Sequence, residues 1–149
     1  MTAETDNQHV HIGAYALCRD PSNRLLLVRA TAGLEDGGLW TMPGGGIEWG
    51  EHPNAALCRE LEEETGLVDI KAYHVASVYS HAYEGWTDWQ GDPVHHIGIV
   101  YEVELATFDL RPEREGSTDH CEWLTESRVR ELPLGPLAEF AFKLAWPKT

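Results

Sequence analysis

The sequence is poor in positive charge and in cysteine. Its 149 residues include 11 Lys and Arg against 25 Asp and Glu, which gives a formal net charge of -14 at pH 7. That sign is wrong for a surface that follows a nucleic-acid backbone, so binding of bulk RNA or DNA is not expected. Small anions remain acceptable substrates, because a bound cation reverses the field locally. Cys18, Cys58 and Cys121 are widely spaced, without a CxxC or Cys/His zinc pattern, which predicts reduced thiols.

Long apolar runs are also missing. No segment approaches the run of about 20 apolar residues that spans a membrane, and the polar N-terminus lacks the apolar region of a signal peptide. We therefore expect a cytoplasmic protein without membrane contact. Residues 1–8 contain almost nothing that could be buried and predict a flexible N-terminal tail. Residues 9–149 are long enough for a single domain and too short for two.

Strand and helix signals alternate in the first half of the chain. Residues 10–17 and 25–28 are apolar segments on either side of the turn-forming sequence DPSN at 20–23, a pattern typical of a hairpin. The one convincing mid-chain helix is expected to begin at Pro53 and to end before Gly66, which suits a left-handed C-terminal cap.

The second half of the chain is rich in strand signals. Strands are predicted at 72–79, 97–105 and 121–124, with a polar loop at 84–93 and a C-terminal helix at 137–145. Strands on both sides of a central helix, followed by a second helix, predict an α/β/α sandwich around a mixed β-sheet.

The charges of the mid-chain helix fall on defined faces. At about 100° per residue, Glu60, Glu63 and Glu64 share one face, whereas Glu62 points nearly the opposite way. Three carboxylates about 6 Å apart repel by roughly 3 kcal/mol per pair at an effective dielectric near 20, and a divalent cation removes that cost. Oxygen ligands favour Mg²⁺, with Mn²⁺ as a substitute. Taken alone, the glutamates fit a solvated helix face equally well.

Residues 45–67 resemble the Nudix box. The segment reads Gly45, five residues, Glu51, seven residues, and then RELEEETGL, which matches every fixed position of that signature. The resemblance implies a Nudix-type fold and hydrolysis of the diphosphate linkage of a nucleoside diphosphate joined to another moiety. The substrate would be a nucleoside triphosphate, a dinucleoside polyphosphate or a nucleotide sugar, attacked by metal-activated water. A homodimer is also in keeping with the resemblance, since dimers are common among similar proteins.

The resemblance implies a role for each matched acidic residue. Glu60, Glu63 and Glu64 look like the family's metal ligands, in agreement with the face found from helical geometry. One carboxylate must accept a proton from the attacking water, and we take Glu63 as that base. A further ligand often comes from a later segment, whose acidic residues are Glu113, Glu115 and Glu122. Glu122 is a candidate ligand and is equally explained as an ordinary edge residue.

The remaining matched positions look like supports for this cluster. Arg59 and Glu51 resemble the family's buried ion pair, which orients the metal ligands. Arg59 therefore joins Glu60 and Glu63 in the catalytic set. Gly45 would let the backbone approach the helix closely.

Four aromatic residues in or near predicted loops are candidates for stacking on a nucleobase: Trp40, Tyr83, Trp86 and Trp89. Trp40 is explained equally well as a core residue, whereas Trp86 and Trp89 in a polar loop are less easily explained by packing. Tyr83 stands sixteen positions after Leu67, where a tyrosine resembles a marker of the dinucleoside-polyphosphate subgroup.

Two classes of function are compatible with these residues. The first is the hydrolase described above. The second is a non-enzymatic Nudix-fold sensor that binds a nucleotide and regulates a partner. A sensor would be free to lose Glu63 or Glu64, and the presence of both favours the hydrolase.

Overall fold

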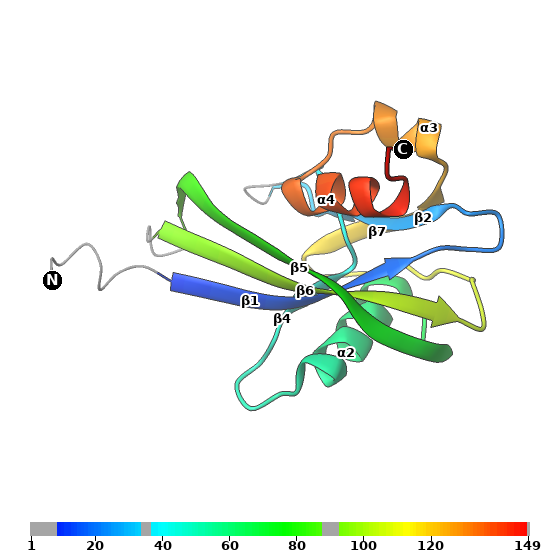
Figure 1. The fold of residues 1–149 in the computed structure, drawn as a ribbon, viewed down its shortest axis with the longest axis horizontal. Helices are drawn as coiled ribbons and strands as arrows, with labels where there is room; N and C mark the ends of the chain where they lie inside the picture. Colours follow the sequence, from blue (N-terminus) through cyan, green and yellow to red (C-terminus); the bar gives the residue numbers. More distant parts are fainter. Residues whose placement is uncertain (1–8, 34–36, 88–92, 149) are drawn as a thin grey trace, which may run out of the picture.

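Two helices sandwich the strands of this protein. The computed structural model describes residues 9–33, 37–87 and 93–148. The elements are β1 (His9–Cys18), β2 (Leu25–Ala30), β3 (Trp40–Thr41), β4 (Gly44–Gly46), α2 (Pro53–Thr65), β5 (Ile70–Thr87), β6 (Pro93–Leu105), β7 (Thr118–Leu124), α3 (Glu126–Glu131) and α4 (Pro136–Ala145). Helices α2 and α4 lie on opposite sides of the strands (Figure 1), which confirms the predicted α/β/α sandwich.

Two predictions concern the N-terminal tail and the absence of membrane contact. The tail predicted at residues 1–8 lies outside the described residues. In the part of the chain that the structure describes, none of the helices is long and apolar enough to cross a membrane.

The strands form two sheets, and the larger of them is the mixed sheet that was predicted. The four-stranded sheet has the order β4-β1-β6-β5, in which β1 and β6 run parallel and the other pairs run antiparallel. The three-stranded sheet has the order β3-β2-β7 and is antiparallel. The predicted mixed character therefore belongs to the larger sheet.

The predicted hairpin over residues 10–28 is wrong in its pairing, although its turn is present. Asn23 adopts a left-handed conformation with φ 60°, and the Asp20 carboxylate accepts a hydrogen bond from the Arg24 amide at 2.8 Å. Strands β1 and β2 nevertheless belong to different sheets, and an isolated bridge between Arg19 and Leu25 joins their ends. The turn sequence acts locally, whereas the choice of strand partner is made by long-range pairing.

The predicted loop at 84–93 is wrong at both ends. Strand β5 continues to Thr87 and β6 begins at Pro93, with these two residues paired across the ladder. Antiparallel pairing with a neighbouring strand overrides the polar and glycine-containing composition that predicted a loop.

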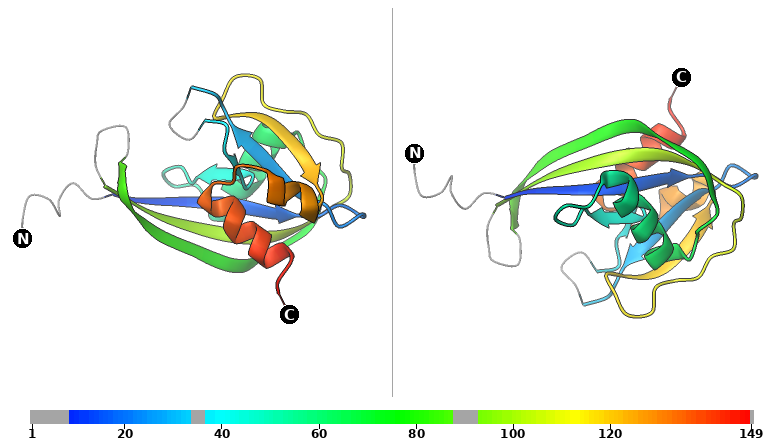
Figure 2. Two further views of the ribbon diagram at one scale, coloured as in Figure 1. Left: turned by 90° about the horizontal axis from the view of Figure 1, so that it is seen from above. Right: turned by 90° about the horizontal axis from the view of Figure 1, so that it is seen from below.

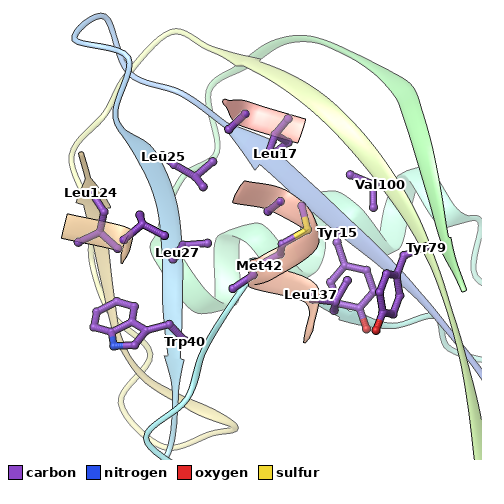
Figure 3. Packing of buried hydrophobic residues seen from close by; sticks show 14 residues of the cluster. Tyr15, Leu17, Leu25, Leu27, Trp40, Met42, Tyr79, Val100, Leu124 and Leu137 are labelled. Carbon is purple, nitrogen blue, oxygen red and sulfur yellow. The ribbon is translucent and has the colours of Figure 1, made fainter. Parts of the chain in front are cut away.

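Alternate residues of β1 and β2 point to opposite sides and supply two cores. The core on the α4 side includes Tyr15 and Leu27, and the core on the α2 side includes Ala14 and Leu26. Figure 3 shows the α4 side, where Tyr15 lies beside Tyr79. Because β2 contributes to both cores, its apolar run is continuous rather than alternating.

Helix α2 has the predicted boundaries, Pro53–Thr65. His52, a poor N-cap by residue type, still caps the helix through a hydrogen bond accepted by Nδ1 at 3.0 Å. Gly66 ends the helix with φ 76°, as expected for a left-handed cap. Leu57 and Leu61 are fully buried and anchor the helix on the sheet, which fixes the direction of its carboxylates.

Helix α3 was not predicted from the sequence. Its N-cap is Thr125, whose side-chain oxygen accepts a hydrogen bond from the Arg128 amide at 3.3 Å. The helix has only six residues, too few for a clear apolar period, and its buried contact is Val129.

Candidate active site

The Arg59 side chain is the centre of a hydrogen-bonded network at the sheet-facing side of α2. Its Nε and Nη2 atoms donate to the two carboxylate oxygens of Glu51, each at 2.9 Å. Nη2 also donates to the Gly46 carbonyl at 3.1 Å. Nη1 lies 2.9 Å from Glu60 Oε1 and 3.5 Å from Glu63 Oε2. One guanidinium therefore connects the loop before the helix to two of the three predicted metal ligands.

The ion pair between Arg59 and Glu51 stays charged at physiological pH. Hydrogen bonds from Arg59 are the main cause that lowers the pKa of Glu51 to about 2. The same hydrogen bonds raise the pKa of Arg59. Both side chains are partly buried, with 27% of Arg59 and 15% of Glu51 exposed. The bidentate geometry fixes the orientation of the guanidinium plane, which a single contact would not do.

Glu64 is the buried member of the glutamate cluster. Its Oε1 accepts a hydrogen bond from the Gly44 amide at 2.7 Å. Burial is the main cause that raises the pKa of Glu64 to about 8, and the neighbouring charges of Glu60 and Glu113 act in the same direction. The hydrogen bond from the Gly44 amide opposes this rise in pKa. A cation beside Glu64 would relieve both the burial penalty and the repulsion.

Glu60 occupies a space that depends on a glycine. A Cβ atom on Gly45 would lie 2.7 Å from both Cδ and Oε1 of Glu60, so a side chain there would push the carboxylate aside. Burial raises the pKa of Glu60, and Arg59 opposes that rise. The structure thus brings together Gly45, Glu60 and Arg59.

Glu63 lies at the rim of the cluster. Its side chain is 47% exposed, and its contact with Arg59 is long. Glu62 is also exposed. The helical face predicted for the three glutamates therefore divides into a sheet-facing pair, Glu60 and Glu64, and a solvent-facing member, Glu63.

Among the acidic residues of the later segment, Glu113 is near the cluster. Its charge raises the pKa values of both Glu60 and Glu64. Its Oε1 accepts hydrogen bonds from the amide and the hydroxyl of Thr118, both at 3.3 Å. These bonds hold the Glu113 side chain beside the first residue of β7.

Glu122 lies on β7 and points away from the cluster. The neighbouring Cys121 is buried, and its thiol pKa is raised by burial and then by the charge of Glu64. Successive residues of a strand point to opposite faces, so Glu122 faces the other side. There its Oε1 lies 3.0 Å from His120 Nε2.

Of the four aromatic residues predicted to stack on a nucleobase, the structure describes only the side chain of Trp40. Trp40 is buried in the α4-side core, with its ring against His120 at a centroid distance of 5.7 Å. Tyr83 and Trp86 belong to β5, and their side chains are outside what the structure describes. Trp89 lies outside the described residues.

Trp49 is an exposed aromatic residue that sequence reasoning missed. It lies in a turn closed by a hydrogen bond from the Glu51 amide to the Glu48 carbonyl at 2.9 Å, with Gly50 at φ 77°. The Glu48 amide also donates to Glu51 Oε1 at 3.0 Å, so the turn is tied to the Arg59 network. Trp49 is fully exposed, at 104% of its reference area. The sequence signal that could have identified Trp49 is the presence of an aromatic residue at a variable position of the Nudix box.

The donor chemistry of the cluster fits a hard divalent cation. Within the described ranges, no group of three or more His, Cys, Asp or Glu side chains is arranged to hold a metal ion by itself. Mg²⁺ at phosphate-binding sites typically takes only one or two carboxylates and completes its shell with water and substrate phosphates. Glu60 and Glu64, with Glu63 and Glu113 beside them, match such an open, all-oxygen set.

Comparison with known proteins agrees with this geometry. The NUDIX domain family model matches residues 9–144. An 8-oxo-dGTP diphosphatase of Proteus vulgaris is 33% identical over 112 residues, which cover 75% of this chain and 90% of that protein. An RNA pyrophosphohydrolase of Brucella anthropi is 51% identical over 107 residues, which cover 63% of this chain and 60% of that protein. This chain therefore spans less than two thirds of the second relative.

A solved structure shows the same fold. The crystal structure of the MutT protein from Methanosarcina mazei Go1 matches with a TM-score of 0.67 at 22% identity, over 93% of this chain and 94% of that one. The family model spans nearly the whole described chain, so the resemblance seen in the Gly45 to Leu67 segment is confirmed. The chain belongs to the Nudix family of pyrophosphohydrolases.

Proposed function

We propose that this protein is a Mg²⁺-dependent hydrolase of small nucleotides and that nucleoside triphosphates are its preferred substrates. The observation that carries the proposal is the pair Glu60 and Glu64, held against the β4 backbone by Arg59 and by the Gly44 amide. Burial raises the pKa of both carboxyl groups, and the charge of Glu113 acts in the same direction on each of them. Such a pair is costly to ionise without a cation, and phosphate substrates bring the matching cation with them.

Each residue of the cluster has a distinct task in this proposal. A bound Mg²⁺ would neutralise charge on the phosphates and activate water for attack on phosphorus. Glu60 and Glu64 hold the cation, and Arg59 orients Glu60 through its bond to Glu51. Glu63, exposed at the rim, accepts the proton of the attacking water. Glu113 is a better candidate than Glu122 for a further ligand, since its charge reaches both Glu60 and Glu64.

The preference for small nucleotides over RNA is supported by charge. One relative is named for 8-oxo-dGTP and another for RNA, so the relatives alone leave both substrates open. A chain with a net charge of -14 repels the many phosphates of an RNA backbone, whereas a single nucleotide complexed with a divalent cation brings far less negative charge to the site.

The proposal is tested by measuring product release from a substrate panel with Mg²⁺, with Mn²⁺ and with chelator. The panel contains nucleoside triphosphates, including oxidised guanine forms, diadenosine polyphosphates, ADP-ribose, nucleotide sugars and a 5′-triphosphorylated RNA. We expect cation-dependent cleavage of a nucleoside triphosphate, with kcat/KM at least about tenfold above that for the RNA, because the surface charge opposes the longer anion. Nucleotide binding without cleavage of any member would instead indicate a sensor.

The Glu63→Gln variant tests the assignment of the base. The amide cannot accept the proton, so turnover should fall by about two to four powers of ten while the fold is kept. Glu62→Gln is the matched control, because it makes the same change at the adjacent exposed position and should leave turnover within about twofold. Near-wild-type turnover of Glu63→Gln, measured at saturating Mg²⁺, would remove Glu63 from this role.

The raised pKa of Glu64 predicts how stability depends on pH and on metal. In chelator, folded Glu64 keeps its proton up to a pKa of about 8, whereas the unfolded chain releases it near the ordinary glutamate pKa of 4.5. The stability that this carboxyl contributes is thus complete below about pH 4.5 and is lost as the pH rises to 8. Mg²⁺ should accordingly raise the melting temperature more at pH 8 than at pH 5.

Differential scanning calorimetry of Glu64→Gln supplies the control for this pH dependence. The amide cannot ionise, so between pH 5 and 8 the variant should lose less stability than the wild-type protein in chelator, and Mg²⁺ should stabilise it less. Identical pH and Mg²⁺ dependence of the two proteins would show that Glu64 neither titrates in this range nor meets the cation.

A further inference from the structure

One face of the four-stranded sheet carries most of the exposed apolar side chains. In the described part of the chain, five of the seven large exposed hydrophobic residues lie on β1 and β5 of this sheet. Two half-buried isoleucines of β6 lie between them. The resulting surface, which we name the neutral sheet face, consists of Val10, Ile12, Tyr73, Val75, Val78, Ile97 and Ile99.

The strand registers place these side chains on the side of the sheet that α2 partly covers. Ile12 pairs with Ile97, and Val78 pairs with Ile99, which belongs to the margin of the α2-side core. Tyr73 likewise pairs with Val103 of that core. Helix α2 packs on β1 and β4, and β5 lies to one side of it in the view from below (Figure 2, right). The neutral sheet face is therefore a continuation of the core beyond the helix.

This face is almost without charge in a strongly acidic chain. Strand β1, residues 71–82 of β5 and residues 93–101 of β6 contain Lys71 as their one charged residue, against 25 acidic and 11 basic residues in the whole chain. Two molecules of net charge -14 repel each other over most of their surfaces. A face without carboxylates is where two copies can approach at the lowest electrostatic cost. A basic partner, by contrast, would be drawn to the acidic surfaces.

The area and shape of the face also suit a second copy. Its five exposed side chains present on the order of 450 Å² of apolar surface, within the range of the largest patch on a typical monomer, which is often functional. A standard interface buries roughly 800 Å² per partner, so the half-buried isoleucines and the polar residues around the face would supply the remaining area. A two-fold axis through β5 places the same side chains opposite one another, as an isologous dimer requires.

We propose that the neutral sheet face is the interface of a homodimer in which β5 and the adjoining face of β6 and β1 pack on their equivalents in a second copy. Burial of apolar surface stabilises the dimer, and repulsion between the acidic remainders of the two chains opposes it. Added salt should therefore tighten the dimer by screening that repulsion, whereas it would weaken docking on a partner of opposite charge.

Sedimentation equilibrium between about 1 and 100 µM tests this proposal. The wild-type protein is expected at twice the chain mass of 16.7 kDa, with tighter association in 0.5 M than in 0.05 M NaCl. Val78→Glu places like charges across the two-fold axis and should weaken the dimer at least about tenfold. Val68→Glu is the matched control, since Val68 and Val78 are each 58% exposed and Val68 lies outside the face.

Three results would overturn the proposal. A wild-type protein that stays at 16.7 kDa at the highest concentration in high salt has no such dimer, and the face then serves another partner. A dimer that Val78→Glu and Val68→Glu leave equally tight uses another surface. If Val78→Glu fails to fold by circular dichroism, the near-isosteric Val78→Thr replaces it; equal dimer affinity of that variant and wild type would likewise refute the interface.

Discussion

The contact on which the site depends is the fork of Arg59 on Glu51. Two parallel hydrogen bonds of 2.9 Å fix the guanidinium plane, and its remaining nitrogen then points at Glu60. The third contact, to the Gly46 carbonyl, ties the same side chain to β4. A single charged group therefore joins the helix, the preceding loop and the sheet edge, and it fixes the position of the Glu60 carboxylate.

This arrangement places the carboxyl groups of Glu60 and Glu64 beside the core, where burial and neighbouring carboxylates make their ionisation unfavourable. Glu64 is only 2% exposed and adjoins a sheet on which Leu57 and Leu61 anchor its helix. Strand β4 approaches α2 closely and contacts both carboxylates. The Gly44 amide donates a hydrogen bond to Glu64, and Gly45, which has no side chain, leaves space for Glu60. The same packing that stabilises α2 thus holds two carboxylates in a state that a divalent cation would relieve.

Local signals predicted the helix and its chemistry, and long-range contacts decided the rest. Pro53 and Gly66 were sufficient to bound α2, because caps act within one turn. The pairing of β1 with β6 instead of β2 was beyond local reasoning, since it depends on residues about 85 positions apart. Helical geometry placed the three box glutamates on one face of α2. It could not separate buried Glu64 from exposed Glu63, because that difference comes from the approach of β4.

The role of Arg59 is tested most directly by comparing the Mn²⁺ affinity of Arg59→Lys with that of the wild-type protein, measured by electron paramagnetic resonance. Lysine keeps the charge but cannot form the fork, so we expect the affinity to be lower by about 10-fold to 100-fold with the fold retained. Arg128→Lys, which alters an exposed pair with Glu131 on α3, should bind Mn²⁺ like wild type. Unchanged Mn²⁺ affinity in Arg59→Lys would contradict the claim that Arg59 positions the carboxylates.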